Sequence, residues 1–126
     1  MTGETQILVL EDEPLIAMDL EDLLVGKGYR VVGPFSTATA ALDSLRTRQP
    51  DTALLDIYLF NGTSFDVARE LKRLGIPYAF MTGLVAPDVL PPDLAGSPII
   101  LKPYREKELL AFVGRGEREE STESSS

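Results

Sequence analysis

The sequence predicts an α/β domain in which strands of a parallel sheet alternate with helices. Five short runs of aliphatic and β-branched residues recur along the chain, and they are almost continuously apolar, as strands covered on both faces are. Amphipathic stretches with a helical repeat lie between them. A length of 126 residues with 44% hydrophobic content is enough for one globular core.

The expected strands are QILVL (6–10), YRVVGPF (29–35), TALLD (52–56), PYAFM (77–81) and PIIL (98–101). Crossovers between parallel strands are right-handed, so this alternation puts helices on both faces of one sheet. The arrangement that fits best is a flavodoxin-like, doubly wound, five-stranded parallel sheet with strand order 2-1-3-4-5.

Helices are expected after the first, second, third and fifth strands. The second should begin at the N-cap Ser36, and the third at a capping box of Thr63 and Asp66, ending at Gly75. The apolar positions that would face the sheet are Ile16, Leu20, Leu23 and Leu24 in the first helix, Ala38, Ala41, Leu42 and Leu45 in the second, Val67, Leu71 and Leu74 in the third, and Leu109, Leu110 and Val113 in the last, near 105–114.

The segment that should form a fourth helix, GLVAPDVLPPDLAGS (83–97), carries Pro87, Pro91 and Pro92. Proline inside a helix costs about 3 kcal/mol or more, so this helix should be short or irregular, with at most one or two turns. The domain should span 1–115, and 116–126 should be a disordered acidic and serine-rich tail.

Composition excludes several classes of function. A net charge of −8 argues against binding to nucleic acid or to anionic membranes. The chain has neither cysteine nor histidine, which rules out Ser-His-Asp and Cys-His catalysis and the usual zinc sites. It has no signal-peptide pattern and no apolar run approaching roughly 18 residues, so a cytoplasmic protein is expected.

Polar residues collect where strands end. Glu11 and Asp12 follow the first strand, Asp56 ends the third, Thr82 follows the fourth and Lys102 follows the fifth. In an open parallel sheet these ends line the ligand crevice, and strands one and three are neighbours. Two carboxylates ~4 Å apart repel by roughly 4 kcal/mol at an effective dielectric of 20, so the acidic cluster needs a cation. Mg²⁺, which prefers oxygen ligands and keeps several waters, suits it.

A metal, a lysine and a hydroxyl around a free carboxylate can stabilise a transferring phosphoryl group, with Asp56 as the nucleophile. Each residue alone also has an ordinary structural explanation. The acids could cap a helix, Asp56 or Thr82 could belong to a turn, and Lys102 could be solvated. Five such residues in order at five strand ends favour the phosphoryl site.

These residues resemble the receiver domain of bacterial two-component response regulators over about residues 5–114. The matching motifs are VLEDEP, LLDIYLFNGTSFD, MTG and LKPY. The resemblance implies that Asp56 accepts a phosphoryl group from the phosphohistidine of a histidine kinase, and that the peptide between Lys102 and Pro103 is cis, as it often is in this family. The residues implied to hold Mg²⁺ are Asp12, Asp56, the backbone carbonyl of Tyr58 and, through water, Glu11; those implied to contact the phosphoryl oxygens are Thr82 and Lys102.

Two features depart from the usual receiver pattern. Ile99 stands three residues before Lys102, where the family carries an aromatic switch residue, so the mode of switching is left open. PYAFMTGL resembles the PFxFATGY signature of the FATGUY class of single-domain receivers, with Met81 in place of alanine and no tyrosine after Leu84. That class tends to lack a regular fourth helix and is commonly linked to kinases of the HWE or HisKA2 type, which makes such a kinase the candidate partner.

The expected function is that of a single-domain response regulator. It would catalyse only its own phosphorylation and dephosphorylation, and would signal by protein contact or act as a phosphate sink. One alternative is a receiver-like binding module that is never phosphorylated. Another is a phosphohydrolase of the haloacid dehalogenase type, but those enzymes use Asp-x-Asp, and here Tyr58 occupies the position of the second aspartate.

Overall fold

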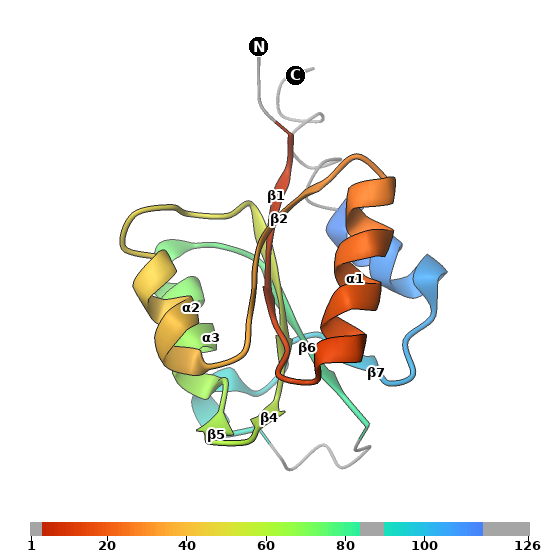
Figure 1. Cartoon of the computed structure of the whole chain (residues 1–126). Coiled ribbons are helices and arrows are strands. Elements are labelled where there is room, and N and C mark those ends of the chain that lie inside the picture. Colours follow the sequence, from red (N-terminus) through yellow and green to blue (C-terminus); the bar gives the residue numbers. More distant parts are fainter. Residues whose placement is uncertain (1–3, 84–89, 115–126) are drawn as a thin grey trace, which may run out of the picture.

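The computed structural model describes residues 4–83 and 90–114, and it confirms the predicted sheet. Five parallel strands lie in the order β2-β1-β3-β6-β7 (Figure 1), which is the expected order 2-1-3-4-5. The strands are β1 (Gln6–Leu10), β2 (Arg30–Phe35), β3 (Thr52–Asp56), β6 (Tyr78–Thr82) and β7 (Ile99–Leu101). Every residue of β3 and β6 is buried, as their continuous apolar runs predict.

Helices cover both faces of the sheet. In Figure 1, α2 (Ala38–Ser44) and α3 (Phe65–Leu74) lie on one side, and α1 (Pro14–Gly26) and the blue helix 106–114 lie on the other. Alternate residues of a strand point to opposite faces, so Leu8 and Leu10 pack in the cluster under α2 and α3, whereas Ile7 and Val9 pack in the cluster under α1. The sheet is thus rigidly held from both sides, and its strand ends are well-defined supports for a site.

Two predicted helix starts are wrong by one or two residues. Thr37, not Ser36, is the N-cap of α2: its backbone is extended, and its Oγ1 accepts a hydrogen bond from the Ala40 amide at 3.1 Å. The capping box at the start of α3 does not form. Thr63 belongs to a short strand instead, so the helix begins after Ser64, and Asp66 pairs with Arg69 at 2.9 Å.

A small antiparallel hairpin, β4 (Tyr58–Leu59) and β5 (Gly62–Thr63), follows β3 and was not predicted. Its strands are too short for a periodic pattern to reveal them. In Figure 1 the hairpin and the turn from β1 into α1 lie at the same lower edge of the sheet. The hairpin therefore borders the strand ends where the polar residues gather.

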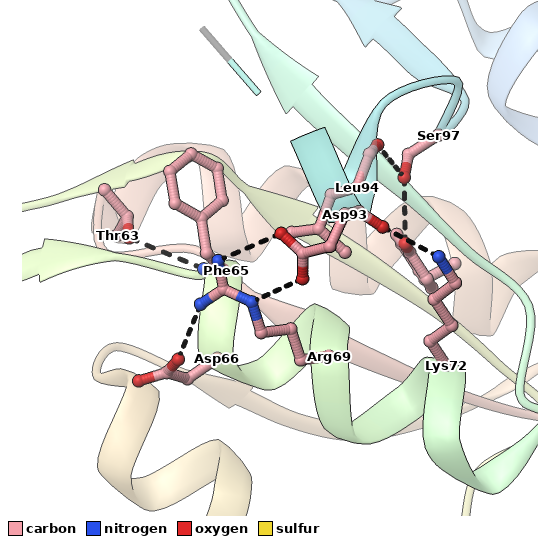
Figure 2. A network of polar contacts seen from close by, with 9 residues as sticks. Thr63, Phe65, Asp66, Arg69, Lys72, Asp93, Leu94 and Ser97 are labelled. Carbon is pink, nitrogen blue, oxygen red and sulfur yellow. Dashed lines mark hydrogen bonds and ion pairs between the residues drawn. The ribbon is translucent and has the colours of Figure 1, made fainter. Parts of the chain in front are cut away.

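The proline-rich segment forms a single turn of 3-10 helix, η2 (Pro92–Leu94), within its described part; residues 84–89 lie outside the described ranges. This agrees with the prediction of a short or irregular fourth helix. Figure 2 shows how side chains attach the segment to α3: Arg69 Nε donates to Asp93 Oδ2 at 2.8 Å, and Lys72 Nζ donates to the Asp93 carbonyl at 2.7 Å. Leu94 is fully buried beneath this network.

The predicted tail, 116–126, also lies outside the described residues. Among the residues that are described, no helix combines the length and the apolar character needed to cross a bilayer.

Candidate functional site

The sheet brings the predicted site residues to one edge. Leu10 pairs with Leu55 in the register of β1 and β3, so Glu11 and Asp56, the next residue along each strand, lie side by side. On the other side of β3, Asp56 pairs with Met81, which places Thr82 at the end of the adjoining strand. The Lys102 amide donates to the Thr82 carbonyl at 2.8 Å. All four positions therefore meet at the carboxyl edge of the sheet, where ligands of such folds bind.

Lys102 lies between two carboxylates. Its Nζ is 2.8 Å from Glu11 Oε1 and 3.2 Å from Asp56 Oδ1. The Glu11 side chain is 0% exposed and the Asp56 side chain 11%, so both charges are largely removed from water. The second Glu11 oxygen accepts a hydrogen bond from the Glu13 amide at 3.0 Å. Glu11 is thus held on both oxygens, and Lys102 partly neutralises it and Asp56 together.

Asp12 has a different partner. Its Oδ2 accepts a hydrogen bond of 2.6 Å from the backbone amide of Phe60, at the tip of the β4–β5 hairpin. Tyr58, whose carbonyl the sequence resemblance assigns to the metal, is in the same hairpin. The contact therefore joins the β1–α1 turn to the segment that follows Asp56.

The donor set fits a magnesium ion. Glu11, Asp12 and Asp56 each offer one carboxylate oxygen, and these oxygens lie within 4.8 Å of one another. Oxygen ligands opposite each other around Mg²⁺ are roughly 4 Å apart, so a small closure of this cluster would suffice. A depression of about 270 Å³ opens beside Glu11 and Asp12 and is lined also by Pro14, Met18 and Pro34. The cluster is therefore open to water on the side of Glu11 and Asp12.

The electrostatics of the site favour a bound cation. Burial and, next, the charge of Glu11 raise the pKa of Asp56 from its ordinary 3.8 to about 6, against the opposing effect of Lys102. For Lys102 itself, burial favours the neutral form, but the hydrogen bond to Glu11 and the charge of Asp56 outweigh it, so the pKa of the ammonium is raised. Lys102 thus remains protonated, yet it does not fully compensate the buried acids.

Two features of this site were not predicted from the sequence. Glu11 was expected to act on the metal through water, and its direct ion pair with Lys102 was not foreseen. The amide of Phe60 was missed altogether, because a backbone donor leaves no residue-type signal; the turn-forming residues Asn61 and Gly62 were the only indication of a hairpin there.

The predicted cis peptide between Lys102 and Pro103 is confirmed, and a second one joins Gly33 to Pro34. Ile99 packs at the edge of the apolar cluster under α2 and α3.

Comparison with known proteins agrees with this geometry. The response regulator receiver domain family matches residues 7–113. The phyllosphere-induced regulator PhyR of Methylorubrum extorquens is 34% identical over 114 residues, which cover 88% of this chain and 43% of PhyR. The solution structure of SdrG from Sphingomonas melonis Fr1 superposes with a TM-score of 0.76 at 35% identity, covering 92% of this chain and 98% of SdrG. The BeF3-activated conformation of SdrG from Pseudomonas melonis Fr1 gives a TM-score of 0.71 at 37% identity, covering 90% and 99%.

The chain spans about half the length of the curated relatives that it matches first. The family match, by contrast, extends over nearly all of the residues that form the sheet and its helices. The chain therefore belongs to the family of response regulator receiver domains.

Proposed function

We propose that the protein accepts a phosphoryl group on Asp56 from the phosphohistidine of a histidine kinase, in a reaction that depends on Mg²⁺. The observation that carries this proposal is the position of Lys102. Its ammonium nitrogen lies 3.2 Å from Asp56 Oδ1 and 2.8 Å from Glu11 Oε1, and both carboxylates belong to one oxygen cluster with Asp12. A nucleophilic carboxylate with a lysine beside it and an oxygen cluster for a cation is the arrangement that phosphoryl transfer needs.

In the proposed reaction an oxygen of Asp56 forms a bond to phosphorus while the nitrogen–phosphorus bond of phosphohistidine breaks. The electron pair of the broken bond returns to the imidazole nitrogen. Lys102 would contact a phosphoryl oxygen, exchanging part of its interaction with the two carboxylates for one with the new group. Thr82, buried at the end of β6, would donate its hydroxyl to another phosphoryl oxygen.

The residues proposed to hold Mg²⁺ are Asp12, Asp56 and the Tyr58 carbonyl directly, with Glu11 acting through water. When bound, the ion would supply positive charge to the phosphoryl oxygens and to the acidic cluster. The buried and mutually repelling carboxylates support this assignment, because the raised pKa of Asp56 indicates that Lys102 alone leaves them under-compensated.

The proposed partner is a kinase of the HWE or HisKA2 type, because the PYAFMTGL segment resembles the FATGUY class. The similarity to PhyR and SdrG supports a receiver of this kind. As in the receiver family generally, the activity would be signalling, not turnover of a small substrate. The signalling output would be a contact with another protein through the surface formed by 90–97, β7 and helix 106–114. Alternatively, the protein would remove phosphoryl groups from a shared kinase.

The direct test is incubation with acetyl phosphate and Mg²⁺, followed by mass spectrometry of the intact protein. The expected result is the gain of one phosphoryl group that is lost in Asp56→Ala and suppressed by EDTA. Asp43→Asn is the matched control, because Asp43 is exposed on α2 and remote from the strand ends. No phosphoryl gain in the wild type, or an equal gain in Asp56→Ala, would leave the binding module that is never phosphorylated as the better explanation.

The choice of kinase is tested by phosphotransfer profiling. Purified HWE or HisKA2 kinases and kinases of other types, each phosphorylated beforehand, are mixed with the protein for short times. Faster transfer from kinases outside the two named types would reject the partner assignment while leaving Asp56 as the acceptor.

A further inference from the structure

The contact between Asp12 and Phe60 joins the β1–α1 turn to the β4–β5 hairpin through a backbone amide, whereas the amide that holds Glu11 comes from Glu13, two residues along the chain. The Phe60 amide donates to Asp12 Oδ2 at 2.6 Å, across 48 residues of sequence. A hydrogen bond this short to a carboxylate is charge-assisted, and such bonds are about twice as strong as neutral ones. Whereas Lys102 holds Glu11 and Asp56, the hairpin holds Asp12.

The hydrogen bond coexists with an assembled metal cluster. With Oδ2 hydrogen-bonded to the Phe60 amide, one oxygen of Asp12 lies within 4.8 Å of oxygens from Glu11 and Asp56. A carboxylate has about four acceptor positions on two oxygens, so one amide leaves room for a cation. The hydrogen-bonded carboxylate therefore lies in the cluster and has acceptor positions left for an ion.

The position of Phe60 in the hairpin adds a second link. Phe60 follows directly on β4, and β4 contains Tyr58, whose carbonyl is the third proposed metal ligand. One hydrogen bond thus connects two proposed ligands that come from separate parts of the chain. The Phe60 ring is 84% exposed, so the amide and not the ring is what this residue gives to the site.

We infer that the backbone amide of Phe60 is a positioning group for the metal site, which fixes the Asp12 carboxylate against the β4–β5 hairpin and thereby raises the affinity for a divalent cation. This inference rests on the proposed function, because it takes Asp12 as a metal ligand. Loss of a group that orients a ligand typically weakens metal binding by 10–100-fold. Since the amide acts on one ligand at a partly exposed position, we expect a loss of about tenfold, the low end of that range.

The test compares Phe60→Pro with Phe60→Ala. Both variants lack the ring, but only the proline variant lacks the amide proton. Calorimetric titration with Mg²⁺ alone should give a dissociation constant about tenfold higher for Phe60→Pro than for Phe60→Ala. Equal affinities of the two variants would overturn the inference. Tighter binding by Phe60→Pro would also overturn it, because the amide would then compete with the ion for Asp12.

A second variant keeps the test valid if proline disturbs the hairpin. Replacing Phe60 by its α-hydroxy analogue converts the amide to an ester and removes the proton without constraining the backbone. Hydrogen exchange of the Phe60 amide in the wild type provides an independent readout. Protection that persists at saturating Mg²⁺ supports positioning, and protection that is lost on saturation rejects it.

Different results would reject the metal site and the role of the Phe60 amide. If the wild type does not bind Mg²⁺ at all, the metal site of the proposed function is wrong, and the inference falls with it. If the wild type binds Mg²⁺, but the ester variant binds as tightly as the wild type and Phe60→Pro as tightly as Phe60→Ala, only the inference is wrong.

Discussion

Replacing Asp56 by Asn should stabilise the fold at neutral pH in the absence of metal. The pKa of Asp56 in the folded protein is about 6, against an ordinary value of 3.8, with burial as the largest cause and the charge of Glu11 next. The folded state therefore holds a proton more tightly than the unfolded chain does. Below pH 3.8 the carboxyl group is protonated in both states, so its ionisation does not lower the free energy of unfolding. Between pH 3.8 and about 6 the free energy of unfolding falls as the pH rises, and above about pH 6 this fall is complete.

The size of the effect follows from the same values. The difference between 3.8 and about 6, at about 1.36 kcal/mol per pH unit, corresponds to about 3 kcal/mol. Asn keeps the shape of the side chain without the charge. Asp56→Asn should therefore exceed the wild type in free energy of unfolding by about 3 kcal/mol at pH 7.5 and by about 1 kcal/mol at pH 4.5.

Urea denaturation in EDTA at a series of pH values measures this difference. Asp43→Asn, on the exposed face of α2, serves as the control for removing one acid from a chain of net charge −8. A difference between Asp56→Asn and the wild type that does not change with pH would refute the electrostatic explanation. So would a destabilised Asp56→Asn at pH 7.5, because it would mean that the attraction of Lys102 outweighs burial and repulsion.

Three further predictions address the site and the helix starts. Lys102→Ala leaves two buried carboxylates without their cation, so it should lower the free energy of unfolding by about 3 kcal/mol at pH 7.5. The loss should be smaller at pH 5, because Asp56 takes up a proton there, and urea denaturation at the two pH values measures both. Mg²⁺ at one hundred times its dissociation constant should stabilise the wild type by about 2.7 kcal/mol, detectable as a higher Tm that is absent in Asp12→Ala. Thr37→Ala should cost about 1 kcal/mol through loss of the α2 N-cap, whereas Ser36→Ala should not; the reverse order in thermal unfolding would restore Ser36 as the cap.

The sheet and the location of the site could be predicted because both follow from coarse physical rules. Continuous apolar runs such as 52–56 and 77–81 can only be buried on both faces, and these became the fully buried strands β3 and β6. Parallel strands then bring their carboxyl ends to one edge, whatever the details of packing. Hence Glu11, Asp56, Thr82 and Lys102 could be placed together from the sequence alone.

The details that were missed depend on backbone conformation and on individual side-chain contacts. Ser36 and Thr37 are both good N-cap residues, and only the extended backbone of Thr37 shows which of them caps α2. The ion pair between Glu11 and Lys102 joins residues 91 positions apart, and no local pattern encodes it. The Phe60 amide is a property of the hairpin turn and not of the phenylalanine.

The reason why this site needs a metal ion differs between the sequence and the fold. From the sequence, repulsion among three crowded acids was the reason. In the fold, Glu11 is paired with Lys102 and with the Glu13 amide, and Asp12 is held by the Phe60 amide, so two of the acids already have donors of their own. Asp56 is the acid that is left under-compensated: it shares Lys102 with Glu11 at the longer distance of 3.2 Å, and its pKa is raised. The residual charge imbalance is thus concentrated on the proposed phosphoacceptor, which is where a cation would both complete the site and favour the ionised, nucleophilic form of the carboxylate.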